Sequence, residues 1–268
     1  FDVVSLSLQR EIADENYMEY FLNGYMSYSD DVYEITINIY ETEGLKVIKK
    51  NTFKGKNIFN LIDEVSISIK KYLSIPENHI DEIIDMPVSE LLTSSLNAYK
   101  NYVIGTWSTW IPGGGITYLE KAIEEDDEFA QAYFSLWIAF RSENRAGGEL
   151  KTLEKVIDLI YKFPESKRAL PKVLYYWTTK DLDKAETLLK RHIKQFPYDT
   201  QGYQLMGEIF MIQDKANEAT NAWTTAINIH ENTLEKNPDV ARLLLRIGNN
   251  ALYNYGDYKV ALKSYNRY

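Results

Sequence analysis

The sequence predicts a predominantly α-helical fold, in which a small α+β N-terminal domain with an antiparallel sheet precedes an all-α array of helical hairpins. Two different hydrophobic periods support this prediction. Between residues 32 and 39 bulky apolar side chains fall on every second position, which is typical of a half-buried strand. From Asn57 onward apolar residues recur every three or four positions, as on an amphipathic helix. We expect residues 1–75 to form the first domain, 76–94 a linker, and 95–268 about five helical hairpins.

In the first domain, the sequence predicts a short strand over Val3–Leu6 and a short polar helix over Ser7–Asn16. A segment that begins at Tyr20 leads into the alternating strand through turn residues at 29–31. Glu43-Gly44 separates this strand from a third antiparallel strand at Leu45–Lys50.

A helix closes this domain. Its apolar face recurs from Ile58 to Leu73, and Asn57 is placed to cap its first turn. Pro76 follows the end of the helix, where a proline stops helical structure.

The segments Phe21–Gly24, Asp31–Ile35, Gly44–Ile48 and Leu61–Leu73 together resemble the small α/β domain of the TolB N-terminal and FlgO-like families. The opening strand of that pattern is absent, so we expect the domain to be N-terminally incomplete. The resemblance implies a binding or assembly module of bacterial envelope or sensory proteins, without catalytic residues.

Seven residues in the second half are spaced as two antiparallel helices require: Tyr203, Met206, Gly207, Phe210, Ala219, Trp223 and Ala226. Gly207 allows a close approach of the two backbones. This pattern resembles the tetratricopeptide repeat (TPR), a helix–turn–helix unit of about 34 residues. The resemblance implies a TPR-like solenoid that binds other proteins on its concave face.

Four further hairpins are expected around this one. Pro171 lies early in the first helix of the third, so we expect that helix to begin near Ala169. The fifth hairpin uses Gly248 and Ala251, and then Ala261 and Tyr265. In the first three hairpins, we expect residues 95–110 to pair with 115–125, 129–141 with 150–161, and 166–179 with 182–196.

The net charge of −9 and the isoelectric point near 5.0 disfavour nucleic-acid binding, which depends on neutralising phosphates with Lys and Arg. A basic or neutral protein partner is easier to accommodate. The chain has no cysteine, which excludes disulfides, thiolate metal sites and a cysteine nucleophile. No run of about 18 apolar residues occurs, so no transmembrane segment is expected. We expect a periplasmic or otherwise envelope-associated location.

The sequence offers little for catalysis. Its three histidines, His79, His192 and His230, are far apart and lack metal-ligand spacing. Gly113-Gly114-Gly115 lacks the Lys-Ser/Thr that follows a phosphate-binding loop. We therefore predict a protein that is not an enzyme and needs no cofactor or metal.

Binding residues follow from the TPR resemblance, which implies ligand contacts from first-helix positions that point away from the hairpin partner. The alternative for Tyr102, Phe134 and Trp177 is packing between repeats. The two-carboxylate clamp known in the family needs Lys and Asn at set positions, and of these only Asn249 is present. The predicted partner-binding residues are Tyr99, Tyr102, Phe134, Arg141, Trp177, Gln204, Glu208, Asn249 and Tyr253.

The function predicted from these residues is a protein–protein interaction module that binds a peptide or protein in the groove. A second hypothesis remains open: the chain is the sensory or regulatory region of a larger bacterial kinase, cyclase or transcription regulator, and binds a small ligand at the domain junction. The fifth hairpin ends at Tyr268 without a capping helix, so we expect a partner, further sequence or a homodimer mate to cover it.

Overall fold

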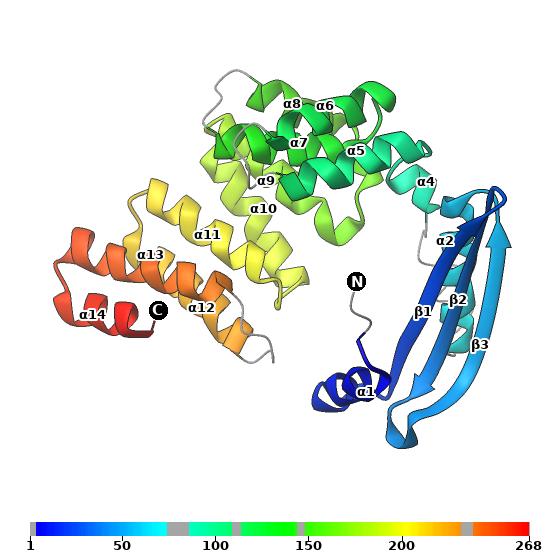
Figure 1. Cartoon of the computed structure of the whole chain (residues 1–268). Helices are drawn as coiled ribbons and strands as arrows, with labels where there is room; N and C mark the ends of the chain where they lie inside the picture. Colours follow the sequence, from blue (N-terminus) through cyan, green and yellow to red (C-terminus); the bar gives the residue numbers. More distant parts are fainter. Residues whose placement is uncertain (1–3, 74–85, 109–113, 144–147, 232–237, 268) are drawn as a thin grey trace. The chain divides into compact units, whose positions relative to one another are not determined.

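The computed structural model describes residues 4–73, 86–108, 114–143, 148–231 and 238–267 (Figure 1). Contacts divide the chain into two compact units, Phe1–Leu96 and Asn97–Tyr268. The first holds a small antiparallel sheet with helices, and the described part of the second is helical. The predicted fold class is therefore confirmed.

The sheet has three antiparallel strands in the order β1-β2-β3. Their bounds are Tyr20–Ser29, Val32–Glu41 and Lys46–Gly55. The loop between β1 and β2 consists of Asp30 and Asp31, which both have positive φ (51° and 59°). Two-residue hairpin loops of this kind match the right-handed twist of the strands, and Asp tolerates the left-handed region. The third strand continues beyond its predicted end at Lys50 because β2 offers it pairing partners as far as Tyr33.

The segment Val3–Leu6 is not a strand where the structure describes it. Residues 1–3 lie outside the described residues, and helix α1 spans Leu6–Glu15. Ser5 caps this helix, since its hydroxyl accepts a hydrogen bond from the Leu8 amide. The local capping interaction therefore prevails over the β propensity of two valines.

Helix α2, Ile58–Tyr72, lies against the sheet (Figure 1) and is capped by Asn57 as predicted. Asn51 of β3 donates to the hydroxyl of Ser68 at 3.0 Å, which fixes the helix on the strand. Of the expected linker, residues 76–85 lie outside the described part. Val88–Leu91 form a short helix, α4, whose first amide donates to Asp63 of α2.

The described residues of the second unit form ten α-helices in five consecutive pairs. The first-helix bounds are α5 Leu96–Trp107, α7 Ala130–Ser142, α9 Ala169–Thr178, α11 Thr200–Ile212 and α13 Pro238–Tyr255. Their partners are α6 Gly114–Glu125, α8 Glu149–Asp158, α10 Leu182–Gln195, α12 Ala216–Glu231 and α14 Tyr258–Arg267. Short 3-10 turns at Ile160–Lys162 and Glu165–Lys167 join α8 to α9, which begins at Ala169 as predicted. The predicted end of the first helix at Trp110 lies outside the described residues.

Glycines allow close contact between the two helices of a hairpin. A Cβ at Gly207 of α11 would lie 2.2 Å from the indole nitrogen of Trp223 on α12. A Cβ at Gly248 of α13 would lie 2.4 Å from the Tyr265 ring on α14. The close approach predicted at Gly207 is thus confirmed. A large side chain on the second helix occupies the space that the glycine leaves on the first.

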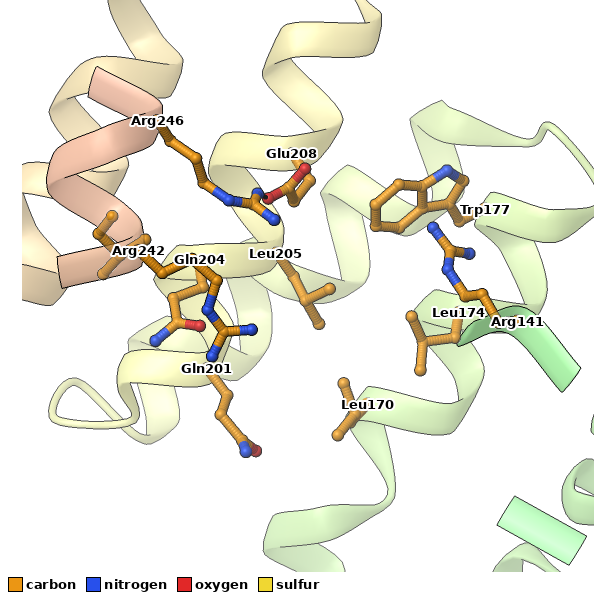
Figure 2. Close-up of a pocket in the computed structure, with 11 residues that line it drawn as sticks. Arg141, Leu170, Leu174, Trp177, Gln201, Gln204, Leu205, Glu208, Arg242 and Arg246 are labelled. Atoms are coloured by element: carbon orange, nitrogen blue, oxygen red, sulfur yellow. Dashed lines mark ion pairs between the residues drawn. The ribbon is translucent and has the colours of Figure 1, made fainter. Parts of the chain in front are cut away.

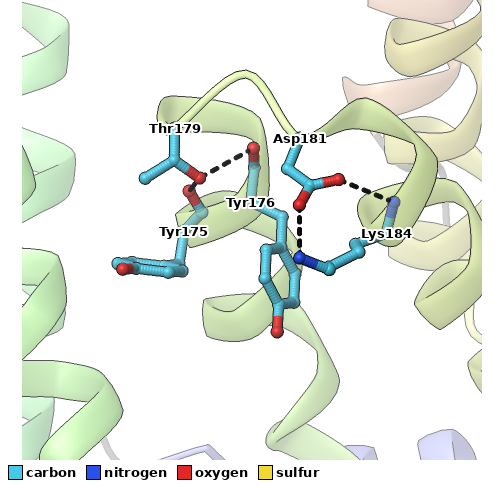
Figure 3. A network of polar contacts seen from close by, with 5 residues as sticks. All are labelled: Tyr175, Tyr176, Thr179, Asp181 and Lys184. Carbon is cyan, nitrogen blue, oxygen red and sulfur yellow. Dashed lines mark hydrogen bonds and ion pairs between the residues drawn. The ribbon is translucent and has the colours of Figure 1, made fainter.

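The turn between α9 and α10 shows how a hairpin is closed (Figure 3). Asp181 caps α10 by accepting from the Lys184 amide, and it forms an ion pair of 2.6 Å with the Lys184 ammonium. That ammonium also lies 5.5 Å from the ring centroid of Tyr176 on α9. The Thr179 hydroxyl donates back to the carbonyl of Tyr175 at 2.9 Å. The end of one helix and the start of the next are therefore tied together locally.

Hydrophobic clusters run from each hairpin to the next. One cluster joins Trp137 of α7 and Val156 of α8 to Leu174 of α9. Another joins Trp223 of α12 to Leu244 of α13. Because each hairpin shares buried surface with its neighbour, the array is stabilised by nearest-neighbour packing, as in other helical repeats. Within the described ranges, no helix has both the length and the apolar character that a membrane crossing requires.

Candidate functional site

A cavity of about 300 Å³ opens among the first helices of four consecutive hairpins (Figure 2). We call it the first-helix groove. Of the residues that the structure describes, those of helices α7, α9, α11 and α13 line it, and none from a second helix does. The lining residues are Arg141, Leu170, Leu174, Trp177, Gln201, Gln204, Leu205, Glu208, Arg242, Leu243 and Arg246.

The apolar part of the groove continues the packed interior. Leu174 and Leu243 are buried and belong to the hydrophobic clusters between hairpins. Leu170 and Leu205 are partly buried and pack against the same interior. Because these side chains are held by the core, they give the groove a largely preformed apolar floor.

Arg141 lies on one side of this floor, in the last turn of α7. Its guanidinium carbon is 4.8 Å from the ring centroid of Trp177 and 5.6 Å from that of Trp137. The positive charge is favoured both by the aromatic faces and by the C-terminal end of the helix dipole. The side chain is nonetheless exposed to solvent.

Arg246 and Glu208 form an ion pair between α13 and α11, on the other side of the floor (Figure 2). The Arg246 guanidinium also lies 5.9 Å from the Trp223 ring centroid. Burial lowers the pKa of Arg246 from its usual value. An arginine starts from a value far above neutrality, so it keeps its charge.

Two glutamines add neutral polar groups. The backbone carbonyl of Gln204 accepts from the Trp223 indole at 3.3 Å. Its side-chain nitrogen is buried, and it has no hydrogen-bond partner among the residues that the structure describes. Gln201, one turn earlier on α11, is exposed. Amide side chains both donate and accept, so this part of the groove suits a peptide backbone.

The groove brings together four of the nine residues predicted from the sequence: Arg141, Trp177, Gln204 and Glu208. Their role in binding stays a proposal. The groove also includes residues that sequence reasoning missed, above all Arg242 and Arg246.

The other five predicted residues lie outside the groove. Tyr102 packs on Phe129, with ring centroids 4.9 Å apart, and Tyr99 lies 6.3 Å from Tyr102. Phe134 packs at 6.0 Å from both Trp137 and Phe163, so it contributes to the core.

Asn249 and Tyr253 lie further along α13. Asn249 accepts a hydrogen bond of 2.8 Å from the Tyr265 hydroxyl, and therefore contacts its own hairpin partner, α14. Tyr253 is 79% exposed.

The described histidines are buried. The Nε2 atom of His192 lies 2.6 Å from a carboxylate oxygen of Asp199, which caps α11. His230 lies in α12, and His79 falls outside the described residues. Among the described residues, no three His, Cys, Asp or Glu side chains are grouped so that they could hold a metal ion.

No family profile matches the sequence, and no characterised protein matches it by sequence. Solved structures do match the fold. Cut9 in the APC/C hetero-tetramer Cut9–Hcn1 superposes with a TM-score of 0.52 and 14% identity, over 64% of this chain and 32% of that chain. The Rap conjugation gene regulator of plasmid pLS20, in complex with the Phr* peptide, superposes with a TM-score of 0.50 and 16% identity, over 69% of this chain and 55% of that chain. MamA from Desulfovibrio magneticus RS-1 superposes with a TM-score of 0.44 and 15% identity, over 65% of this chain and 93% of that chain.

The stacked hairpins and the similarities to Cut9 and to the Rap regulator show that the helical unit has the fold of a TPR-type helical repeat protein. The resemblance of residues 1–75 to the TolB N-terminal and FlgO-like families stays a prediction.

Proposed function

We propose that this protein is a non-enzymatic interaction module whose first-helix groove binds a segment of another protein. The observation that carries the proposal is the origin of the groove: all eleven residues come from first helices of consecutive hairpins. A cavity built in this way crosses several repeats, so it can accept an elongated ligand.

The chemistry of the lining supports a peptide ligand. Leu170, Leu174 and Leu205 provide an apolar floor for side chains, while Gln201 and Gln204 can bond to backbone N–H and C=O groups. Trp177 and the arginines are residue types that contribute much of the binding energy at protein interfaces. The Rap regulator holds a peptide on the same kind of fold, which supports the proposal.

Other parts of the sequence-based hypothesis remain proposals. They are the envelope-associated location, the absence of a cofactor or nucleic-acid partner, and a homodimer through the fifth hairpin. The second hypothesis remains that the chain is a sensory or regulatory region of a larger signalling protein and binds a small ligand at the domain junction.

The test is a selection of phage-displayed random linear peptides on the immobilised 268-residue chain. Selected peptides are then measured on the variant Gln201→Trp, which places an indole at the exposed rim of the groove. The control is Gln195→Trp, the same substitution at an exposed residue of the second helix α10. We expect at least a tenfold loss of affinity, about 1.4 kcal/mol, for the first variant alone.

The proposal would be overturned in either of two cases. One is that no peptide is enriched. The other is that every enriched peptide binds both tryptophan variants as well as it binds the wild type.

A further inference from the structure

The charge of the first-helix groove is opposite to that of the whole chain. The chain carries a net charge of −9. The groove is lined by three arginines, Arg141, Arg242 and Arg246, and by one carboxylate, Glu208. A partner that enters the groove meets this local charge at close range, because more distant charges are screened by salt within about 8–10 Å.

Arg141 is the best placed of the three to bind an anion. It is exposed and has no ion pair with a carboxylate in the part of the chain that the structure describes. Its guanidinium carbon lies within 5.6 Å of the ring centroids of both Trp137 and Trp177. These contacts limit the number of rotamers that the side chain can adopt, so it loses less entropy when a ligand binds.

A guanidinium beside an aromatic ring still has N–H donors available at its edge. Those donors match the two oxygens of a carboxylate in a bidentate pair, which is among the stronger hydrogen-bonded contacts in proteins. The aromatic contacts and the carboxylate therefore use different parts of Arg141.

The cations stand on both sides of the apolar floor. Figure 2 shows Arg141 beside Trp177 on one side, Arg242 and Arg246 on the other, and Leu170, Leu174 and Leu205 between them. Glu208 is engaged with Arg246. A segment that crosses the floor thus meets arginine before and after its apolar contact.

We infer that the groove selects an internal acidic segment of its partner, in which an Asp or Glu carboxylate binds Arg141 and a neighbouring apolar side chain lies on the leucine floor. This inference rests on the proposed function, since it specifies the ligand of the same groove. It replaces the expectation of a basic partner, which followed from the net charge alone.

The experiment uses two degenerate peptide pools, both amidated at the C-terminus so that side chains supply the only carboxylates. One pool combines Asp and Glu with Leu, and the other has Asn and Gln in their place. Binding to the 268-residue chain is measured by fluorescence anisotropy. We expect the acidic pool to bind at least about tenfold more tightly. The preference should weaken as ionic strength rises from about 0.1 M to about 1 M, where the Debye length falls from about 10 Å to about 3 Å.

Three variants test whether the preference for the acidic pool arises at Arg141. Arg141→Glu should abolish the preference for acid, and Arg141→Lys should retain part of it, because the charge remains while the bidentate geometry is lost. The control is Arg191→Glu, the same charge change at an exposed residue of the second helix α10, and it should leave the preference intact. Circular dichroism verifies that each variant is folded.

The outcomes separate the two proposals. Equal binding of both pools, with both lost in Gln201→Trp, overturns the acidic selectivity and leaves peptide binding in the groove intact. A preference for acid that survives Arg141→Glu, or binding that needs a free C-terminal carboxylate, also overturns the inference. If neither pool binds and the phage selection fails as well, both proposals are overturned.

Discussion

At Gly207 a single hydrogen atom occupies the side-chain position because the indole of Trp223 fills the adjacent space. Gly202 lies on the same helix and has more room: a Cβ there would lie 3.2 Å from side-chain atoms of His192 and Ile193, which would have to move by only a few tenths of an ångström. The two glycines therefore share a helix and differ in their surroundings.

Alanine at these two positions should have different effects. Alanine gains about 1 kcal/mol of helix propensity over glycine in a helix interior, as at Gly207, and less at Gly202, which lies in the first turn of α11. Only Gly207→Ala also forces Trp223 away, at a cost of about 1–3 kcal/mol or more for overpacking. We expect Gly207→Ala to lower the midpoint of thermal unfolding relative to Gly202→Ala. Equal midpoints would show that the helices can separate freely at this contact.

Glu186 of α10 is a second residue with a specific local role. One carboxylate oxygen pairs with Lys190 at 2.5 Å, and the other accepts from Gln213 at 3.0 Å and pairs with Lys215 at 3.3 Å. Gln213 and Lys215 lie between α11 and α12, so this carboxylate links the third hairpin to the fourth. The hydrogen bond from Lys190 is the largest of the effects that lower the pKa of Glu186 from 4.5 to about 2.

This lowered pKa predicts how stability depends on pH. A carboxylate with a depressed folded-state pKa stabilises the protein above pH 4.5, and this contribution is lost as the pH falls from about 4.5 to about 2. We expect Glu186→Gln to be less stable than the wild type at neutral pH by about 1 kcal/mol or less. Urea denaturation should show the difference shrinking across this window. A difference that does not change with pH would contradict the assignment.

At the scale of elements, buried polar contacts fix how one hairpin sits on the next. Asn250 of α13 is 3% exposed. Its amide donates to the Ala216 carbonyl and to the Thr220 hydroxyl of α12, both at 2.8 Å, and its oxygen accepts from Asn254. The amide nitrogen of Asn250 is therefore engaged across the contact between the fourth and fifth hairpins, and its oxygen is engaged within α13.

Asn250→Ala should destabilise the helical unit by about 1–3 kcal/mol, because it leaves buried acceptors without their donor. The matched control is Asn249→Ala, the same substitution at the adjacent exposed residue, which removes only the exposed hydrogen bond from Tyr265 and should cost only about 0.5 kcal/mol. Thermal unfolding monitored by circular dichroism measures both. Similar values for the two variants would argue against a specific role for Asn250.

The sequence was sufficient to predict most elements, since their signals are local. Asn57 marks the start of α2, and Pro171 marks where α9 can begin. The prediction of a strand at Val3–Leu6 was wrong because the capping hydroxyl of Ser5 outweighed the β propensity of the residues. The α4 segment gave no periodic signal, because it is one turn long and depends on a distant contact with Asp63.

The groove could be predicted only in part. Arg242 and Arg246 were missed although they lie seven residues before Asn249 and Tyr253, and hence on nearly the same face of α13. Repeat offsets identify a face, but the angle between successive hairpins decides which turns of that face meet the neighbouring helix. The spacing of two arginines at i and i+4 on a first helix was the available signal.

At the scale of the whole molecule, the net charge of −9 should govern encounters with large polyanions, while the groove governs what binds at close range. The wild-type chain should therefore not bind a fluorescent single-stranded DNA at about 0.15 M salt, where non-specific binding requires many phosphate contacts. Anisotropy titrations measure this directly. DNA binding that is lost in Arg141→Glu would mean that the groove accepts phosphates and is not specific for acidic peptides.

The four hairpins that line the groove contact one another neighbour to neighbour, through apolar packing and local polar contacts, so small tilts between successive hairpins can add up along the array. A ligand that contacts all four hairpins connects them across the three contacts between neighbouring hairpins. When a ligand fills the groove, the backbone amide hydrogens of α7 through α13 should exchange with solvent more slowly, and all of these helices should be protected together. The partner then controls how stiff the array is.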